Sequence, residues 1–444
     1  MHVKLSKNNG TNHANQTLKL SMKQKECYIG FEPLTDFDQM VEGLLQDHPD
    51  DKWRSIRNLC RVAEPEDRHQ LASSIEKCFD TVQDLRIRSR LVLAIKALKN
   101  PIESSGYVLV KGKGAFKEQE LPFEKFGSAK SEKCDHLTHF LPVVDFRINP
   151  QIPDMKLFVD MRRAGVSKGV IVATDTDPSD LDRPLIRENL YKQYACCDQS
   201  RWLSFDEILP HLRNSLHSIT NVTNTDVSTW VMDYPGVLFG LGSVNLSKDR
   251  RYVEEKLAQI GKLGLKGVNL LPHAQFFNPA ENENIDILFQ YCKSSGFIVV
   301  SHTGCGMGPF DILELSRNSN PILWTRVLKK FPDVPLVFSH FGSYSEFLPG
   351  IWLYETLNLG KNFQNVYAEL SGVEWILDRP EIVREIRKTI TFDRILFGTD
   401  YPLPLMSGMG PVCLVGSVQA NRHLSDKEKR KVLGENAIKL LRSN

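Results

Sequence analysis

From residue 141 onward, short apolar runs recur along the chain, and each run is followed by a stretch long enough for a helix. There are eight such runs, at residues 142–146, 169–173, 237–244, 267–271, 297–301, 335–339, 366–370 and 394–398. Continuous apolar runs of this length are typical of strands that are buried on both faces, and their alternation with helices favours parallel pairing. The pattern therefore predicts a parallel sheet built from eight β-α units.

Eight β-α units in a segment of this length match the count and size of a closed barrel. We therefore predict an α/β fold with a (β/α)₈ TIM barrel over residues 136–444. An open, doubly wound sheet is the alternative, but no G-x-G-x-x-G follows the first run, and we expect no nucleotide cofactor. The second connection, at 174–235, is too long for one loop and one helix, so we expect it to cover the mouth of the barrel.

Residues 1–135 have a different pattern of apolar and polar positions. Residues 1–30 are rich in Asn, Lys and Ser without apolar periodicity, which predicts a flexible tail. Within residues 31–135 apolar side chains recur at helical spacing, for example at Met40, Leu44 and Leu45, so we predict a mostly helical accessory segment packed on the barrel. This segment holds no cluster of chemically reactive residues.

Composition and charge exclude several classes of protein. Lys and Arg number 56 against 54 Asp and Glu, so no overall field attracts nucleic acid or an anionic membrane, and we expect neither as a partner. No segment approaches 18 consecutive apolar residues. The nine cysteines form no C-x-x-C pair, which favours free thiols in a reducing compartment, and we expect a cytoplasmic protein. A homo-oligomer is compatible with this sequence.

Polar and ionisable residues follow the apolar runs at the positions where a barrel of this kind carries its active site, the carboxyl ends of the strands. The candidates at these ends are Arg147, Asn149, Asn269, His273, His302, His340, Glu369 and Asp400. Two histidines and one aspartate end the fifth, sixth and eighth runs, and residues of this chemistry at corresponding places predict a shared site.

These endings resemble the amidohydrolase superfamily, and most closely the metal-dependent TIM-barrel hydrolases and decarboxylases that include aminocarboxymuconate-semialdehyde decarboxylase. The matching stretches are VVDFRINP, GLKGVNLLPHAQFFNP, GFIVVSHTG, PLVFSHFGS, NVYAELSGV and RILFGTDYPLP. The resemblance covers residues 141 to 441. It implies that a His-x-His pair of strand one, a strand-five His and a strand-eight Asp bind a divalent metal, while the strand-six His ligates or transfers protons.

The chain departs from this pattern at strand one, where Arg147-x-Asn149 replaces His-x-His. Arginine does not give up its proton to bind a cation, and its charge repels one at close range. Asn269 stands where some relatives carry a metal-bridging lysine. His302, His340 and Asp400 remain as ligands for at most one divalent ion, for which zinc is the best match, with lower affinity than the full ligand set would give.

Three further residues have expected roles outside this ligand set. His273 follows strand four, and we expect it to form hydrogen bonds at the rim of the site. Glu369 is expected to pair with Arg147, with service as an additional acid as the alternative. For Cys305, a passive loop thiol is favoured over a nucleophile, because no base is specified beside it.

Three functions compete on this reading. The first is a hydrolase or carboxy-lyase for a small anionic, carboxylated substrate, in which His302 and Asp400 hold a metal, His340 and Asp400 move protons, and Arg147 binds the substrate carboxylate. In the second, a metal-free lactone or ester hydrolase, Asp400 is the base, the two histidines stabilise the oxyanion, and Arg147 replaces the cation. The third is an inactive binding protein of the same fold, motivated by the missing strand-one ligands.

Overall fold

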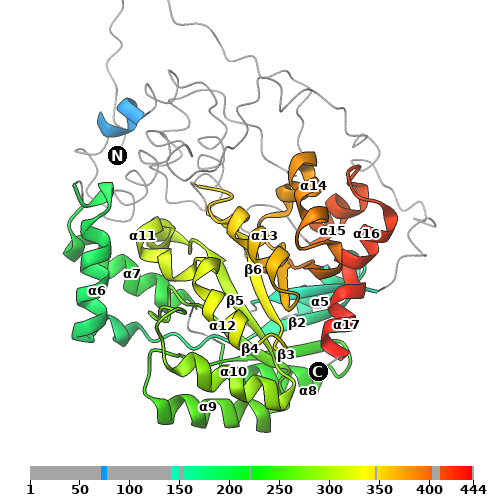
Figure 1. Ribbon diagram of the computed structural model, residues 1–444, viewed down its shortest axis with the longest axis horizontal. Helices are drawn as coiled ribbons and strands as arrows, with labels where there is room; N and C mark the ends of the chain where they lie inside the picture. The colour runs from blue at the N-terminus through cyan, green and yellow to red at the C-terminus, as the bar shows by residue number, and fades with distance from the viewer. Residues whose placement is uncertain are drawn as a thin grey trace, which may run out of the picture.

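The computed structural model describes residues 72–77, 142–149, 155–201, 203–219, 222–345, 348–402 and 411–442. It contains one eight-stranded parallel sheet in which the strands follow their sequence order. Figure 1 shows the sheet with helices packed around it. The expected tail at 1–30 lies outside the described residues. The expected accessory segment at 31–135 does so too, apart from a short helix at 72–77.

Each predicted apolar run contains or overlaps one strand of the sheet. The strands are β1 (Val143–Ile148), β2 (Val166–Val172), β3 (Leu238–Ser243), β4 (Gly267–Leu270), β5 (Ile298–Gly304), β6 (Leu336–Tyr344), β7 (Val366–Glu369) and β8 (Ile395–Leu396). Every neighbouring pair is parallel, so all eight carboxyl ends lie at the same face.

Backbone contacts between the first and last strands close the sheet. The N–H of Phe146 donates to the carbonyl of Phe397 at 2.9 Å, and the N–H of Asp400 donates to the carbonyl of Arg147 at 2.9 Å. A parallel bridge between Ile148 and Tyr401 extends this pairing beyond β8. The sheet is therefore a barrel, and the predicted (β/α)₈ fold is confirmed.

The strands are apolar throughout because both of their faces are buried. One set of side chains, including Val144 and Phe146 of β1, fills the barrel interior together with Leu440 and Leu441 of α17 (Asn436–Arg442). The alternate residue of β1, Val143, packs outward against the surrounding helices. Full burial of a side chain of this size contributes about 1.5–3 kcal/mol, so both layers stabilise the barrel.

Several of the helices that surround the sheet are amphipathic. α9 (Arg250–Lys262) buries Val253, Leu257 and Ile260 at helical spacing and starts at Asp249, whose side chain accepts from the Tyr252 N–H. The other helices outside the second connection are α5 (Met155–Arg163), α10 (Asn284–Ser295), α11 (Leu313–Ser316), α12 (Thr325–Lys330), α13 (Leu353–Asn362), α14 (Pro380–Lys388), α15 (Pro411–Ala420) and α16 (Asp426–Arg430). In the described part of the chain, no helix has the length and apolarity needed to cross a bilayer.

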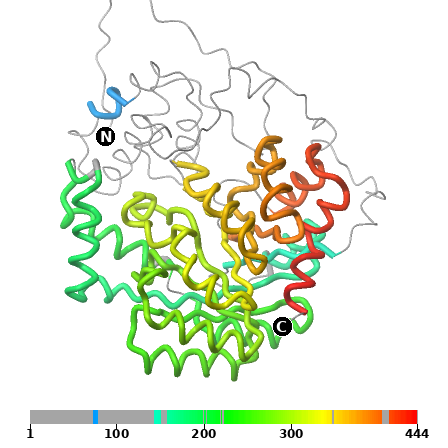
Figure 2. The backbone as a smooth tube through the Cα atoms, viewed as in Figure 1, coloured from blue at the N-terminus to red at the C-terminus, as the bar shows by residue number. Residues whose placement is uncertain are grey.

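The long second connection is helical. It contains α6 (Pro184–Ala195), α7 (Phe205–Ile219) and α8 (Asn224–Asp233), and α8 packs against β3. α6 contacts α11, while α7 contacts the short helix η5 (Gly308–Asp311), and both of these partners follow β5 (Figure 2). The connections after β2 and β5 therefore lie against each other.

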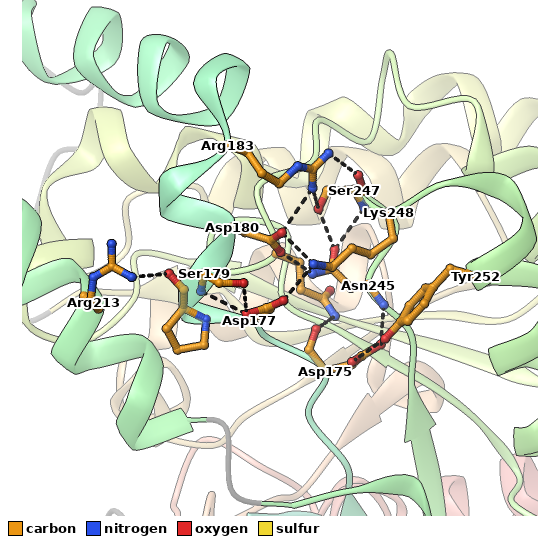
Figure 3. Close-up of polar contacts among 12 residues, drawn as sticks. Asp175, Asp177, Ser179, Asp180, Arg183, Arg213, Asn245, Ser247, Lys248 and Tyr252 are labelled. Carbon is orange, nitrogen blue, oxygen red and sulfur yellow. Dashed lines mark hydrogen bonds and ion pairs between the residues drawn. The ribbon is translucent and has the colours of Figure 1, made fainter.

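A network of ion pairs anchors the start of this connection to the loop after β3 (Figure 3). The Nζ of Lys248 donates to Asp177 at 2.8 Å and to Asp180 at 2.6 Å. Arg183 donates to the carbonyl of Ser247 at 2.9 Å. Because Asp180 is buried and its carboxylate is fully bonded, this network holds the two loops in one arrangement.

Candidate active site at the carboxyl end of the barrel

Arg147 and Asp400 form a buried ion pair across the junction of β1 and β8. The guanidinium Nε donates to Oδ1 of Asp400 at 2.9 Å, and the two residues are also joined through their backbones. The relative exposure is 3% for Arg147 and 8% for Asp400. The amide of Asn149 donates to the same Oδ1 atom. Strand one therefore supplies two donors to the strand-eight carboxylate.

The other end of the guanidinium reaches across the barrel. Nη1 of Arg147 donates to Oδ1 of Asn269 at 3.3 Å and to Oγ of Ser339 at 3.0 Å. Asn269 is itself oriented by a bond from its Nδ2 to the carbonyl of Ala173 at 2.9 Å. Arg147 thus links the ends of β1, β4, β6 and β8.

Three histidines form a row beside this ion pair. The ring centroids of His273 and His302 are 4.5 Å apart, and those of His302 and His340 are 4.8 Å apart. Nδ1 of His273 is 3.0 Å from Oγ of Ser319. The structure therefore brings His302, His340, Arg147 and Asp400 together, with His273 at the end of the row.

Two of these histidines are held in defined tautomers. Nε2 of His302 lies 3.0 Å from the carbonyl of Cys305, and Nδ1 of His340 lies 2.8 Å from the carbonyl of Ser371. A carbonyl oxygen only accepts, so these ring nitrogens carry the proton. In a neutral ring, Nδ1 of His302 and Nε2 of His340 then carry lone pairs.

Burial keeps the three rings neutral. It lowers the pKa of His340 to about 4, with the charge of Asp400 acting against this shift and that of Arg147 adding to it. Burial also lowers the pKa of His273 to about 3, and it lowers the pKa of His302 well below its usual value, with the neighbouring histidines and Arg147 contributing. Near neutral pH His340 therefore offers a base.

Glu369 does not take the expected place beside the Arg147 guanidinium. Its two carboxylate oxygens instead accept from the N–H and, at 2.8 Å, from the hydroxyl of Ser371. A Cβ on Gly398 would lie 2.2 Å from Oε1 of Glu369, so the glycine leaves room for the carboxylate in this position. Burial raises the pKa of Glu369 to about 7, although Arg147 and Ser371 act in the opposite direction.

The sequence analysis missed Asp145, Ser339, Ser371 and Thr399. Asp145 is fully buried and accepts from the N–H and hydroxyl of Thr399 at 2.9 Å and 2.6 Å, and this fixes the residue before Asp400. Burial raises the pKa of Asp145 to about 7. An acidic residue inside an apolar run was the available signal for Asp145. For Ser339 and Thr399 the signal was their position directly before His340 and Asp400.

The backbone is strained at two residues of the site. His340 has a φ of 59° and Asp400 a φ of 57°, in the left-handed region that non-glycine residues rarely adopt. Such a conformation costs about 1–3 kcal/mol and is found most often at functional sites. The strained backbone of His340 and Asp400 therefore supports their assignment to a functional site.

The side chains at this face do not fit a resident divalent ion. Among the residues that the structure describes, no three His, Cys, Asp or Glu side chains are placed to share a metal. Oδ1 of Asp400 is bonded to Arg147 and Asn149, and the guanidinium charge repels a cation. The expected ligand set of His302, His340 and Asp400 is thus not assembled, and the donor geometry does not favour the expected zinc.

We expect the purified protein to hold well under one divalent ion per chain, and an Arg147→His/Asn149→His double variant to hold more. The double variant restores two imidazole ligands and removes the charge that repels a cation. Elemental analysis after dialysis against Zn²⁺ or Mn²⁺ measures the number of metal ions per chain in the native protein and in the double variant. Arg147→Met is the matched control, because it removes the charge without adding a ligand. Equal metal occupancy in the native protein and the double variant would contradict the claim that Arg147 and Asn149 prevent metal binding.

Solved structures of similar fold include several enzymes, and their likeness to this chain is distant. An uncharacterised TIM-barrel protein from Bordetella bronchiseptica is 19% identical, with 68% of this chain and 99% of that chain covered and a TM-score of 0.49. A 5-carboxyvanillate decarboxylase from Novosphingobium aromaticivorans with bound manganese is 18% identical, with 65% and 81% covered and a TM-score of 0.44. A probable 2-pyrone-4,6-dicarboxylic acid hydrolase from Acinetobacter baumannii with bound citric acid is 12% identical, with 68% and 99% covered and a TM-score of 0.42.

No significant match is found among curated proteins. A family model does match the chain. It covers residues 214–443, which include β3 to β8 with His302, His340 and Asp400 but not the first strand with Arg147. Because this match spans more than half of the chain, the protein belongs to the amidohydrolase family.

Proposed function

We propose that this protein is a hydrolase that acts on a small carboxylated ester or lactone without a resident metal ion. The observation that carries the proposal is the Arg147–Asp400 ion pair beside a neutral His340. In the amidohydrolase family, the resemblance noted above places a metal at these strand ends, and here a fixed guanidinium supplies the positive charge instead.

The proposed roles follow from the hydrogen bonds. Arg147 binds the substrate carboxylate, since its guanidinium is held in place by Asp400, Asn269 and Ser339. Nε2 of His340 takes a proton from water as the water oxygen attacks the substrate carbonyl, and returns it to the leaving oxygen. The N–H groups of His302 and His340 already donate to carbonyls, so the geometry does not favour the oxyanion role expected for them.

The neutral state of His340 favours hydrolysis over decarboxylation. Loss of CO₂ leaves a carbanion that an acid must protonate, whereas attack by water requires a base. With its pKa lowered to about 4, the ring is uncharged near neutral pH, and its one proton, on Nδ1, is donated to the carbonyl of Ser371. The carboxy-lyase activity is therefore the less favoured reaction for this site.

We expect small carboxylated esters and lactones to stabilise the native protein in a thermal-shift screen and to be hydrolysed by it. A ligand at about 100 times its Kd stabilises the folded state by about 2.7 kcal/mol. Acid release in a pH-stat detects hydrolysis, and CO₂ release detects decarboxylation. Arg147→Met should abolish the thermal shift. If the variant responds as the native protein does, Arg147 does not bind the carboxylate.

A second candidate function, an inactive binding protein of the same fold, is favoured by one observation. Asp400 already neutralises the charge of Arg147, so the guanidinium does not require an anionic ligand as its counter-ion. The same screen separates the two functions. Stabilisation without turnover of any carboxylated ester or lactone supports the binding protein, whereas turnover that is lost with His340→Asn supports the hydrolase.

A further inference from the structure

A continuous chain of hydrogen bonds connects Glu369 of β7 with His340 of β6. The hydroxyl of Ser371 donates to Oε2 of Glu369 at 2.8 Å. The same hydroxyl oxygen lies 3.1 Å from Nδ1 of His340, and the carbonyl of Ser371 lies 2.8 Å from that nitrogen. All three residues are buried, with relative exposures of 0%, 0% and 2%.

The direction of these bonds fixes the histidine. Because the Ser371 hydroxyl gives its proton to Glu369, its oxygen presents a lone pair to the ring. Both oxygens of Ser371 then accept from one donor, the Nδ1–H of His340. A ring protonated only at Nε2 would set the Nδ1 lone pair against these two acceptors, and a ring rotated by half a turn would place a carbon there in place of the N–H donor.

We infer that Glu369 and Ser371 are positioning residues for His340, and that they hold its ring as the Nδ1–H tautomer with Nε2 directed to the substrate. Neither residue touches the reacting atoms in this assignment. The inference rests on the proposed function for the role of His340, but the tautomer itself is a property of the free protein.

The residues around Glu369 hold its carboxylate in the position where it accepts from Ser371. A Cβ on Gly398 would lie 2.2 Å from Oε1 of Glu369 and 3.1 Å from Cβ of Arg147, so the niche for the carboxylate exists only with glycine there. The Ser371 N–H donates to this same oxygen, Oε1. The charges of Arg147 and Asp400, on the neighbouring β1 and β8 side of the barrel, act on Glu369, and the carboxyl of Glu374 also interacts with it.

The tautomer of His340 can be read from the ¹⁵N chemical shifts of its ring in the full-length native protein, with His340→Asn to assign the signals. We expect a protonated Nδ1 and an unprotonated Nε2. In Glu369→Gln and Ser371→Ala the backbone carbonyl of residue 371 still accepts from Nδ1, but the hydroxyl acceptor is redirected or lost, so we expect shifted ring signals and a minor population protonated at Nε2. Ser371→Thr, which keeps the hydroxyl, should restore the native signal. Ser343→Ala is the matched control, because it removes a buried hydroxyl that donates only to the carbonyl of Phe341.

Kinetics provide the second readout. For a substrate found in the screen, we expect Glu369→Gln and Ser371→Ala each to lower kcat about tenfold or more with little change in KM, and their effects not to add. A native His340 protonated at Nε2, or unchanged ring signals in both folded variants, would overturn the inference. If no substrate is turned over, the proposed function fails, and the ring signals still decide the inference. If the variants do not fold, the native spectrum decides it alone.

Discussion

Replacing Asp400 by asparagine is expected to lower the free energy of unfolding by about 3–5 kcal/mol, because it leaves the Arg147 guanidinium buried without a counter-charge. Asparagine is the informative substitution here, since Asp400 has a φ of 57° and asparagine tolerates that backbone conformation. The loss of stability therefore reports the missing charge rather than backbone strain. Urea denaturation followed by circular dichroism measures it.

The control for this variant is an exposed ion pair of the same type. Arg251 and Glu255 pair on the surface of α9 with side-chain exposures of 88% and 65%, so Glu255→Ala should leave stability nearly unchanged. Adding Arg147→Met to Asp400→Asn removes the unpaired charge and should recover much of the lost stability. Equal stabilities for the native protein and Asp400→Asn would mean that the buried ion pair does not form in solution.

Replacing His340 by asparagine is expected to lower kcat/KM by about 10²–10⁴-fold, the usual contribution of a general base. Asparagine can still donate to the carbonyl of Ser371 and tolerates the φ of 59°, but it has no atom in the place of Nε2. The histidine of the α7 surface provides the control, and His217→Gln should keep native activity. A His340→Asn variant with more than a tenth of the native activity would show that another group accepts the proton.

The role of His340 as a base also predicts the pH profile of the proposed hydrolysis. Burial lowers the pKa of His340 to about 4, so the ring is the required neutral base at every pH above this value. We expect kcat/KM, which reports the free enzyme, to fall as the pH drops through about 4 and to show no loss from this residue near pH 6.5.

The barrel could be predicted from the sequence because its strands are buried on both faces. The run at 394–398 illustrates this, since β8 itself spans only Ile395–Leu396, yet the apolar run and the polar residues after it mark the strand end. Because the carboxyl ends of parallel strands lie at one face of a barrel, the sequence also placed His302, His340, Arg147 and Asp400 together at that face. Topology alone determines this placement, so it required no knowledge of side-chain packing.

The pairing of side chains within the site could not be predicted in the same way. Glu369 and Asp400 both end strands near Arg147, and the sequence does not say which carboxylate the guanidinium reaches. The choice depends on the space beside Gly398 and on Ser371, which takes both oxygens of Glu369. The histidine tautomers likewise depend on the backbone carbonyls of Cys305 and Ser371. Every residue has such a carbonyl, so the sequence does not indicate which one a histidine contacts.

Whether Arg147 or a metal ion binds the substrate carboxylate is measured most directly by calorimetric titration of a carboxylate from the screen into metal-depleted protein. The titration is run with and without one equivalent of Zn²⁺ or Mn²⁺. We expect one binding site per chain with the same Kd in both titrations, because the guanidinium supplies the positive charge. Binding that appears only after the metal is added, and that Arg147→Met leaves intact, would contradict this account.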